Sequence, residues 1–481
     1  MKTAGGSGRS SGAGGQLFGD VCRVGAYAAA YFMAHQISFL FPDYDKILVA
    51  VWPAGGIGLA ALLLCPRRLW TALLTSFFIA GCSASLLSGR PVSASAGFMV
   101  ANILESLGCA WLIIRFCGEK TGFIRIREII FLVIAATAVN ACSAIVGAGT
   151  AALTSNNSFW NFWFTWLISD GLGILIIAPL IVTWSRICEF KEELRWYRIT
   201  EAIAFTLLWF LSIKVIFEPT IVVGSLSLGP YLLSTLIIWP ALRFGQHGMS
   251  FALLLLAVLA VCSHSVSAGP TPWGDAAPLE RLLIVQLYLG AIAAAGLILA
   301  ASYEERKSGE KKFRRISQEW QRTFDSMSEA VWILDKDQMV LRSNKAAELY
   351  FHRPCAEMVG KHCWEIVHGT THPISECPTM RARKSLHHES VELQIGEGWF
   401  VFTADPILDV DGRFNGIVHI VNNITERKLT DLKMSEQLDE LRRLHDSMLG
   451  REIRVIEVKK EVNELLARLG EAPRYSRVKE E

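Results

Sequence analysis

Long runs of apolar residues, separated by short polar segments, fill the chain from about residue 17 to residue 301. A helix needs about 20 predominantly apolar residues to cross the hydrocarbon core of a bilayer. At that length the first part of the chain predicts a polytopic α-helical membrane bundle of about ten spans. The spans are expected to begin near Val24, Leu48, Leu69, Ala94, Ile129, Phe159, Ile199, Gly229, Met249 and Leu282.

The loops between the predicted spans alternate in charge. Lys and Arg follow every second span, whereas other loops, such as residues 155–158 and 263–278, carry no positive charge. Because positively charged loops stay on the cytoplasmic side of a membrane, both termini are expected in the cytoplasm. The basic loops contain Arg67, Arg68, Arg115, Lys120, Arg125, Arg127, Arg186, Lys191, Arg195, Arg198, Arg243, Arg306 and Lys307.

Residues 1–19 are expected to form a disordered cytoplasmic tail, because residues 1–15 are rich in Gly and Ser and almost free of apolar side chains. The tail lacks the apolar core and cleavage site of a removable signal peptide. The formal net charge is +2, and no basic stripe is interleaved with aromatic residues. Nothing in the composition therefore indicates nucleic-acid binding.

From about residue 304 the hydrophobic pattern changes to that of a soluble, charged protein. Residues 304–322 predict a signalling helix that continues the last span. Alternating apolar and polar residues then predict strands at 390–395, 399–406 and 414–421. The turn Asp409-Val-Asp-Gly412 between the last two strands is typical of a hairpin.

Residues 429–470 have the spacing of a coiled coil. Apolar residues recur every seven positions, and most partner positions three residues on are also apolar. Five successive heptads predict a parallel coiled coil and a homodimer, although a single amphipathic helix packed on the preceding domain is an alternative. Residues 471–481 are expected to be a disordered tail. The seam contains Met434, Leu441, Leu444, Met448, Val455, Val458, Val462, Leu465 and Leu469.

Polar residues inside apolar runs are the candidate sensing site of the membrane bundle. A charged side chain at the centre of a bilayer costs at least ~2.5–3.5 kcal/mol, so it is seldom without a role. Asn102 and Glu105 lie in the fourth predicted span and Asp170 in the sixth, while Trp52 and Pro53 lie in the second. These residues predict either a polar ligand or signal site, or hydrogen bonds that hold helices together.

Four motifs in the apolar half resemble those of the first class of bacterial membrane-associated sensor domains, the MASE type. They are Trp52-Pro-Ala-Gly-Gly, Asn102-Ile-Leu-Glu105, Trp166-Leu-Ile-Ser-Asp170-Gly-Leu-Gly, and Trp239-Pro-Ala-Leu-Arg-Phe-Gly245. The resemblance covers about residues 20–303. It implies an input module in a bacterial inner membrane, of the kind that precedes PAS, histidine kinase or diguanylate cyclase domains.

Residues 313–428 resemble a PAS domain of the S-box kind. The resemblance is carried by the order of predicted strands and helices, by Asn344-Lys-Ala-Ala and by the closing Ile424-Thr-Glu-Arg-Lys, although Asn423 replaces the usual Asp. It implies a five-stranded antiparallel sheet with helices on one face. Such domains bind a small ligand or cofactor, or relay signals; which cofactor, if any, is unknown from this sequence.

Cys363, His368 and Cys377 form the candidate metal or redox site of the PAS-like segment. Two Cys and a His offer ligands for zinc or an iron centre. The related PAS pattern often carries one more Cys, near Ile374 here, and a closed structural zinc site needs four ligands. A loop in which these side chains are only structural is the alternative.

The chain has no phosphoacceptor His in its usual acidic setting, no Gly-rich ATP lid and no Gly-Gly-Asp-Glu-Phe cyclase signature. We therefore expect no enzymatic activity, and a receptor that resembles the input half of a sensor kinase or diguanylate cyclase. Its expected partners are a second copy of the chain, membrane lipid, and a separate cytoplasmic kinase, cyclase or response regulator, or another membrane protein. A secondary transporter with a regulatory tail and a truncated kinase or cyclase are the alternatives.

Overall fold

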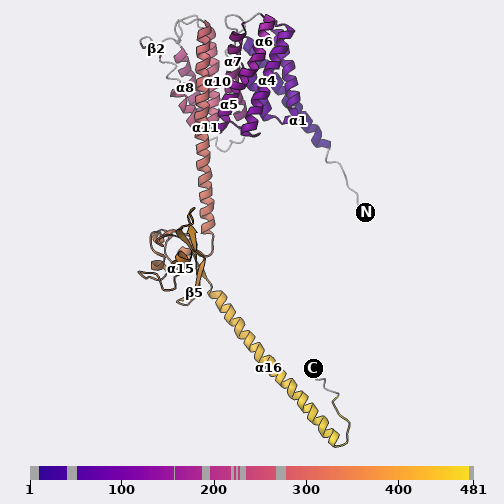
Figure 1. Cartoon of the computed structure of the whole chain (residues 1–481), viewed down its shortest axis with the longest axis vertical. Helices are drawn as coiled ribbons and strands as arrows, with labels where there is room; N and C mark the ends of the chain where they lie inside the picture. Colours follow the sequence, from indigo (N-terminus) through magenta and orange to yellow (C-terminus); the bar gives the residue numbers. More distant parts are fainter. Residues whose placement is uncertain are drawn as a thin grey trace. The chain divides into compact units, whose positions relative to one another are not determined.

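The computed structural model describes residues 10–40, 51–155, 158–186, 196–217, 222–223, 226–227, 235–266 and 278–475. The chain divides into two compact units, Met1–Lys312 and Phe313–Glu481. Figure 1 shows the first unit as a bundle of helices that lie side by side.

The first unit is almost entirely helical. One π-helical turn (η2) joins α5 to α6, so these elements form one long apolar helix, Ile126–Ser155. The helices are α1 (Ser10–Leu40), α2 (Pro53–Leu64), η1 (Arg67–Leu69), α3 (Trp70–Leu87), α4 (Val92–Cys117), α5 (Ile126–Ile134), η2 (Ala135–Val139), α6 (Asn140–Ser155), α7 (Phe159–Trp184), α8 (Trp196–Phe217), α10 (Ile238–Val266) and α11 (Pro278–Asp325), with a short pair of strands, β1 (Val222–Val223) and β2 (Leu226–Ser227).

Within the described residues, six helices are long and apolar enough to cross a membrane. The membrane bundle is thus confirmed, but the predicted count of about ten spans is not. In the described part of the candidate second span, from Val51 on, the structure has a 12-residue helix, α2, which is about 18 Å long and too short to cross the core. The span predicted near Gly229 begins outside the described residues.

Helix α1 begins at Ser10, so residues 10–19 are helical where the composition predicted a disordered tail. The apolar side chains Leu17 and Phe18 extend the helix toward the N-terminus. Residues 1–9 of that predicted tail lie outside the described residues.

The short helix α2 packs backbone to backbone on α7. Trp52 is its N-cap and Pro53 its first residue, a position where Pro loses no helical hydrogen bond. The Trp52 amide donates a hydrogen bond of 3.0 Å to the Ser169 carbonyl. A Cβ atom at Gly173 would lie 1.8 Å from the Trp52 carbonyl oxygen, and one at Gly56 would lie 2.3 Å from the Gly173 carbonyl oxygen. Only glycine allows this approach.

Two consecutive glutamates of α11 bind the ends of other helices. Gly245 interrupts α10 with φ 60° and ψ −147°, and Glu304 Oε1 accepts a 2.9 Å hydrogen bond from the Gln246 amide just after it. Glu305 Oε2 accepts a 3.2 Å hydrogen bond from the amide of Ile126, the first residue of α5.

The second unit contains the predicted five-stranded antiparallel sheet, in the order β4-β3-β7-β6-β5. Trp332, fully buried at its centre, donates its indole N–H to Ser343 Oγ. The strands are β3 (Ala330–Asp335), β4 (Val340–Ser343), β5 (Glu389–Ile395), β6 (Gly398–Leu408) and β7 (Phe414–Asn423), and the helices between β4 and β5 are α12 (Lys345–Phe351), α13 (Cys355–Met358), α14 (Cys363–Val367) and α15 (Pro378–Ser385).

The hairpin predicted between β6 and β7 is present. Asp409 Oδ1 accepts hydrogen bonds from the amides of Asp411 and Arg413. Gly412 adopts φ +76°, which a glycine reaches without strain.

The chain ends in the long helix α16 (Thr425–Arg468), none of whose residues is buried. Its seam side chains face solvent in the single chain: Leu441 is 64% exposed, Leu444 59% and Val455 46%. These exposed side chains do not fit the alternative in which α16 packs against the PAS-like domain. The dimer stays a prediction.

Candidate functional site

The two acidic residues predicted inside the membrane are both buried in the bundle. Glu105 is 0% exposed on α4 and Asp170 is 3% exposed on α7. Asn102, 2% exposed, lies three residues before Glu105 and therefore on the same face of α4. The three predicted polar residues are thus all interior, and none faces lipid.

The two carboxyl groups interact with each other, and Trp166 also faces Glu105. Nevertheless, no donor among the described residues forms a hydrogen bond of acceptable geometry with either oxygen of Glu105 or with Asp170 Oδ2. The other Asp170 oxygen accepts a long bond of 3.4 Å from the Ser169 hydroxyl. A buried polar atom without a hydrogen-bond partner is costly in free energy. The two carboxyl groups are therefore suited to bind a hydrogen-bond donor.

The start of α2 borders the pair. A Cβ atom added to Gly55 would lie 2.5 Å from Glu105 Oε1. The backbone amide of Trp52 is hydrogen-bonded to the carbonyl of Ser169, the residue that precedes Asp170 on α7. The predicted residues Trp52 and Pro53 therefore belong to this site by position: they begin the helix whose first turn touches Glu105.

Two buried residues of the same region were missed from the sequence. His35 on α1 donates through Nδ1 to the Tyr31 carbonyl, has no partner at Nε2 among the described residues, and lies edge-on to Trp52 at 4.8 Å. Asn140 donates to the Leu167 carbonyl at 2.9 Å, and its Oδ1 has no partner. Both are polar residues in apolar runs, the signal that identified Glu105 and Asp170.

Asn140 directly follows the π-helical turn η2, and such turns are frequent at functional sites. The hydrophobicity pattern of the sequence does not reveal the π-helical turn η2, so it could not be predicted.

In the second unit, Asn344 has a structural role. It is the N-cap of α12, and its Oδ1 accepts hydrogen bonds from the amides of Ala347 and Val331. Its Nδ2 donates to the Glu329 carbonyl at 2.8 Å. All its polar atoms thus tie α12 to β3.

Cys363 and Cys377 are brought together, whereas His368 is not. Both thiols contact the Thr379 hydroxyl, Cys377 at 2.9 Å. Burial, followed by the neighbouring Cys377, raises the pKa of the Cys363 thiol to about 12. The ring of His368 lies 6.1 Å from that of Phe402, and burial lowers its pKa.

No group of three or more His, Cys, Asp or Glu side chains arranged to hold a metal ion occurs in the described part of the chain. The predicted metal site at Cys363, His368 and Cys377 gains no support from this geometry and stays a prediction.

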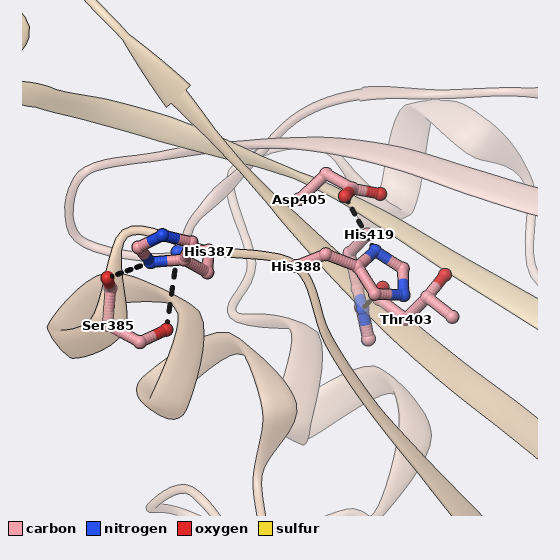
Figure 2. A network of polar contacts seen from close by, with 6 residues as sticks. All are labelled: Ser385, His387, His388, Thr403, Asp405 and His419. Atoms are coloured by element: carbon pink, nitrogen blue, oxygen red, sulfur yellow. Dashed lines mark hydrogen bonds and ion pairs between the residues drawn. The ribbon is translucent and has the colours of Figure 1, made fainter.

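Figure 2 shows three further histidines of this unit, His387, His388 and His419. His419 is buried and its Nδ1 donates to the Thr403 carbonyl at 2.8 Å; burial lowers its pKa to about 4, so it is neutral near pH 7. His388 pairs with Asp405 at 2.7 Å, but both side chains are largely exposed. These contacts stabilise the sheet and form no reactive cluster.

A surface hollow of about 320 Å³ lies at the start of α7, away from the carboxyl pair. It is lined by Trp160, Asn161, Trp163, Phe164 and Thr165, with Leu283 of α11. Tryptophans of this kind are enriched where a membrane helix meets the headgroups, and the hollow therefore adds nothing to the candidate site.

The family model of MASE1 matches residues 21–307, which is most of the chain. The chain belongs to the MASE1 family. A PAS domain model matches residues 328–426. The predicted order of a MASE-type sensor domain followed by a PAS domain is therefore confirmed, and the MASE1 match extends from Val21 in α1 to Lys307 in α11.

Solved structures similar to the chain match it over the PAS region. The PAS domain of a protein from Colwellia psychrerythraea is 17% identical and covers 23% of this chain and 98% of its own, with a TM-score of 0.19. The PAS domain from Bordetella pertussis BvgS is 16% identical and covers 26% and 98%, with a TM-score of 0.20. A sensory box sensor histidine kinase from Vibrio cholerae is 18% identical and covers 24% and 93%, with a TM-score of 0.18. No curated protein matches the chain.

Around the carboxyl pair the MASE1 bundle buries both acceptors and donors that have no hydrogen-bond partner among the described residues. The acceptors are two oxygens of Glu105 and one each of Asp170 and Asn102, and the donors are the indole N–H groups of Trp52 and Trp166. The carboxyl oxygens favour a ligand that donates hydrogen bonds. This site is the best candidate in the MASE1 bundle for the place where a signal is received.

Proposed function

We propose that this chain is an inner-membrane receptor of bacteria that senses a signal at the Glu105–Asp170 site and relays it to a separate effector protein. The observation that carries this proposal is the buried, unpartnered carboxyl pair within a MASE1 sensor domain. Buried ionisable groups in a membrane domain are by default functional. The PAS domain and α16 would pass the change on, through a parallel dimer, to a kinase, a cyclase, a response regulator or another membrane protein.

Helix α11 supports this relay, because it extends from the last span of the MASE1 domain to Asp325, just before the first PAS strand. A continuous helix transmits a rotation or a shift along its axis without an intervening joint. Both termini then lie in the cytoplasm, as the loop charges predict.

Asp170→Asn and Glu105→Gln are expected to leave membrane insertion intact and to change the receptor's output. The assay is a chimera in which residues 1–470 carry the catalytic core of a diguanylate cyclase in heptad register. Each variant should change cyclic dinucleotide production about fivefold or more, the lower end of typical coupling between sites. Glu128→Gln is the matched control: Glu128 is buried in the same bundle, but it accepts hydrogen bonds from the amides of Gly122 and Ile124.

If both variants signal like wild type while the chimera itself responds to its surroundings, the carboxyl groups are only interhelical packing contacts and the sensing site lies elsewhere.

The orientation has its own test. Reporter fusions after Arg127 and after Arg306 should give cytoplasmic signals, and a fusion after Gly269 should give an extracytoplasmic one. An extracytoplasmic signal at Arg306 would put the PAS domain on the wrong side and contradict the relay.

The fragment from Glu304 to Glu481 is expected to have neither kinase nor cyclase activity, because no catalytic signature is found in it. Incubation with labelled ATP and GTP is the measurement, with a sensor kinase and a diguanylate cyclase as positive controls. Turnover above that of a heat-denatured sample would make the chain an enzyme.

A further inference from the structure

Among the described residues, no Lys or Arg forms an ion pair with Glu105 or Asp170. The titratable groups that act on the pair are Tyr31 of α1 and Cys109 of α4, while His35 of α1 and Cys82 of α3 are neighbours of Tyr31. Within the described residues, α2, η2 and α7 add no further titratable side chain besides Asp170. Arg90 acts on His35, and tyrosine and thiol groups cannot supply positive charge.

The space beside the pair is small. Gly55 touches Glu105 so closely that a single added carbon would collide at 2.5 Å, and the same carbon would also meet Ile174. Gly56 and Gly173 bring the backbones of α2 and α7 into contact next to it. A ligand of several atoms has no room on this side of the carboxyl pair unless α2 moves.

Two ionised carboxylates in contact are unstable in such a place. Both can only accept hydrogen bonds, so they cannot bind each other, and like charges in an apolar interior repel strongly. One proton resolves both difficulties: the neutral carboxyl donates to the ionised one. The first turn of α2 carries the positive end of a helix dipole, and Gly55 in that turn lies against Glu105. This turn favours one remaining negative charge, but not two.

We propose that Glu105 and Asp170 bind one shared proton, and that this proton is the ligand to which the MASE1 bundle responds. The second half of the proposal rests on the receptor function proposed above. Loss of the proton leaves two negative charges between α4 and α7, which pushes these helices apart. Because the Trp52 amide is bound to Ser169, next to Asp170, the start of α2 moves with α7.

Infrared spectroscopy of the purified full-length protein tests the proton directly. In an ester-free detergent at neutral pH, the wild type should give the C=O band of one carboxylic acid per chain, which disappears in alkaline solution. The double variant E105Q/D170N should lack this band, whereas E128Q should keep it. A wild-type protein without the band from mildly acidic to mildly alkaline pH overturns the proposal, and so does a double variant that retains it.

The chimera then separates the proton from the receptor function. Its output should change over the same pH range in which the band disappears, and this response should be lost in the double variant but not in E128Q. If the band behaves as expected while the output ignores pH, the proton is a structural element and the sensing half of the proposal is wrong. If Glu105→Gln and Asp170→Asn also fail to change the output, the proposed receptor site itself is wrong, although proton binding stands.

Discussion

Replacing Val455 and Val462 with Asp is expected to convert the fragment 304–481 from a dimer into a monomer. Both valines lie on the heptad seam of α16, and neither is buried within one chain. Burying a valine contributes about 1.5–3 kcal/mol, so four of them in a dimer contribute at least about 6 kcal/mol. The dissociation constant should rise at least about ten-thousand-fold, as measured by sedimentation equilibrium.

The control variant carries Ile453→Asp and Ile456→Asp. Like the two valines, Ile453 and Ile456 are β-branched and apolar, and they are 57% and 36% exposed. Unlike the valines, they lie off the heptad seam. The control should remain largely dimeric. If it dissociates and the seam variant does not, the helices meet through a different face. If both remain dimeric, the PAS domain holds the dimer and α16 is not the main contact.

Gly173→Ala is expected to have the largest effect on the membrane unit. Its new Cβ atom would lie 1.8 Å from the carbonyl oxygen and 2.7 Å from the carbonyl carbon of Trp52, and a backbone cannot rotate away as a side chain can. Overpacking of this kind costs about 1–3 kcal/mol or more, so the melting temperature in detergent should fall by roughly 5 °C or more.

Gly149→Ala provides the matched comparison, because Gly149 lies in a helix of the same bundle and a Cβ atom there meets nothing within 4 Å. It should melt like the wild type or slightly higher, since alanine favours helices. Equal melting of Gly173→Ala and wild type would mean that α2 moves freely away from α7, and that their close contact does not define the site.

The sequence predicted features that depend on local pattern. Strand alternation and the Asp409–Gly412 turn led to the correct hairpin, and Asn344 was recognised as the start of the PAS-like Asn344-Lys-Ala-Ala motif. The carboxyl groups of Glu105 and Asp170 were visible because any charge stands out in an apolar run.

Features that depend on distant contacts escaped prediction. The apolar run after Leu48 has the composition of a span, and only the hydrogen bond from Trp52 to Ser169 reveals where α2 begins. Periodicity does not distinguish a half-length helix from a whole one when both are surrounded by apolar residues. Likewise, Cys363 and Cys377 are 14 positions apart, and their meeting at Thr379 results from the fold of the intervening loop.

The two glutamates at the end of the last span constrain how α11 can move. Consecutive residues of a helix point about 100° apart, so Glu304 and Glu305 reach two different neighbours, the Gln246 and Ile126 amides. A piston displacement of α11 along its axis would break both hydrogen bonds together. A rotation about that axis would also displace both glutamates from their amides. The exit of α11 is thus held at two points, and this helix moves only if both hydrogen bonds break or the bonded parts of α10 and α5 move with it.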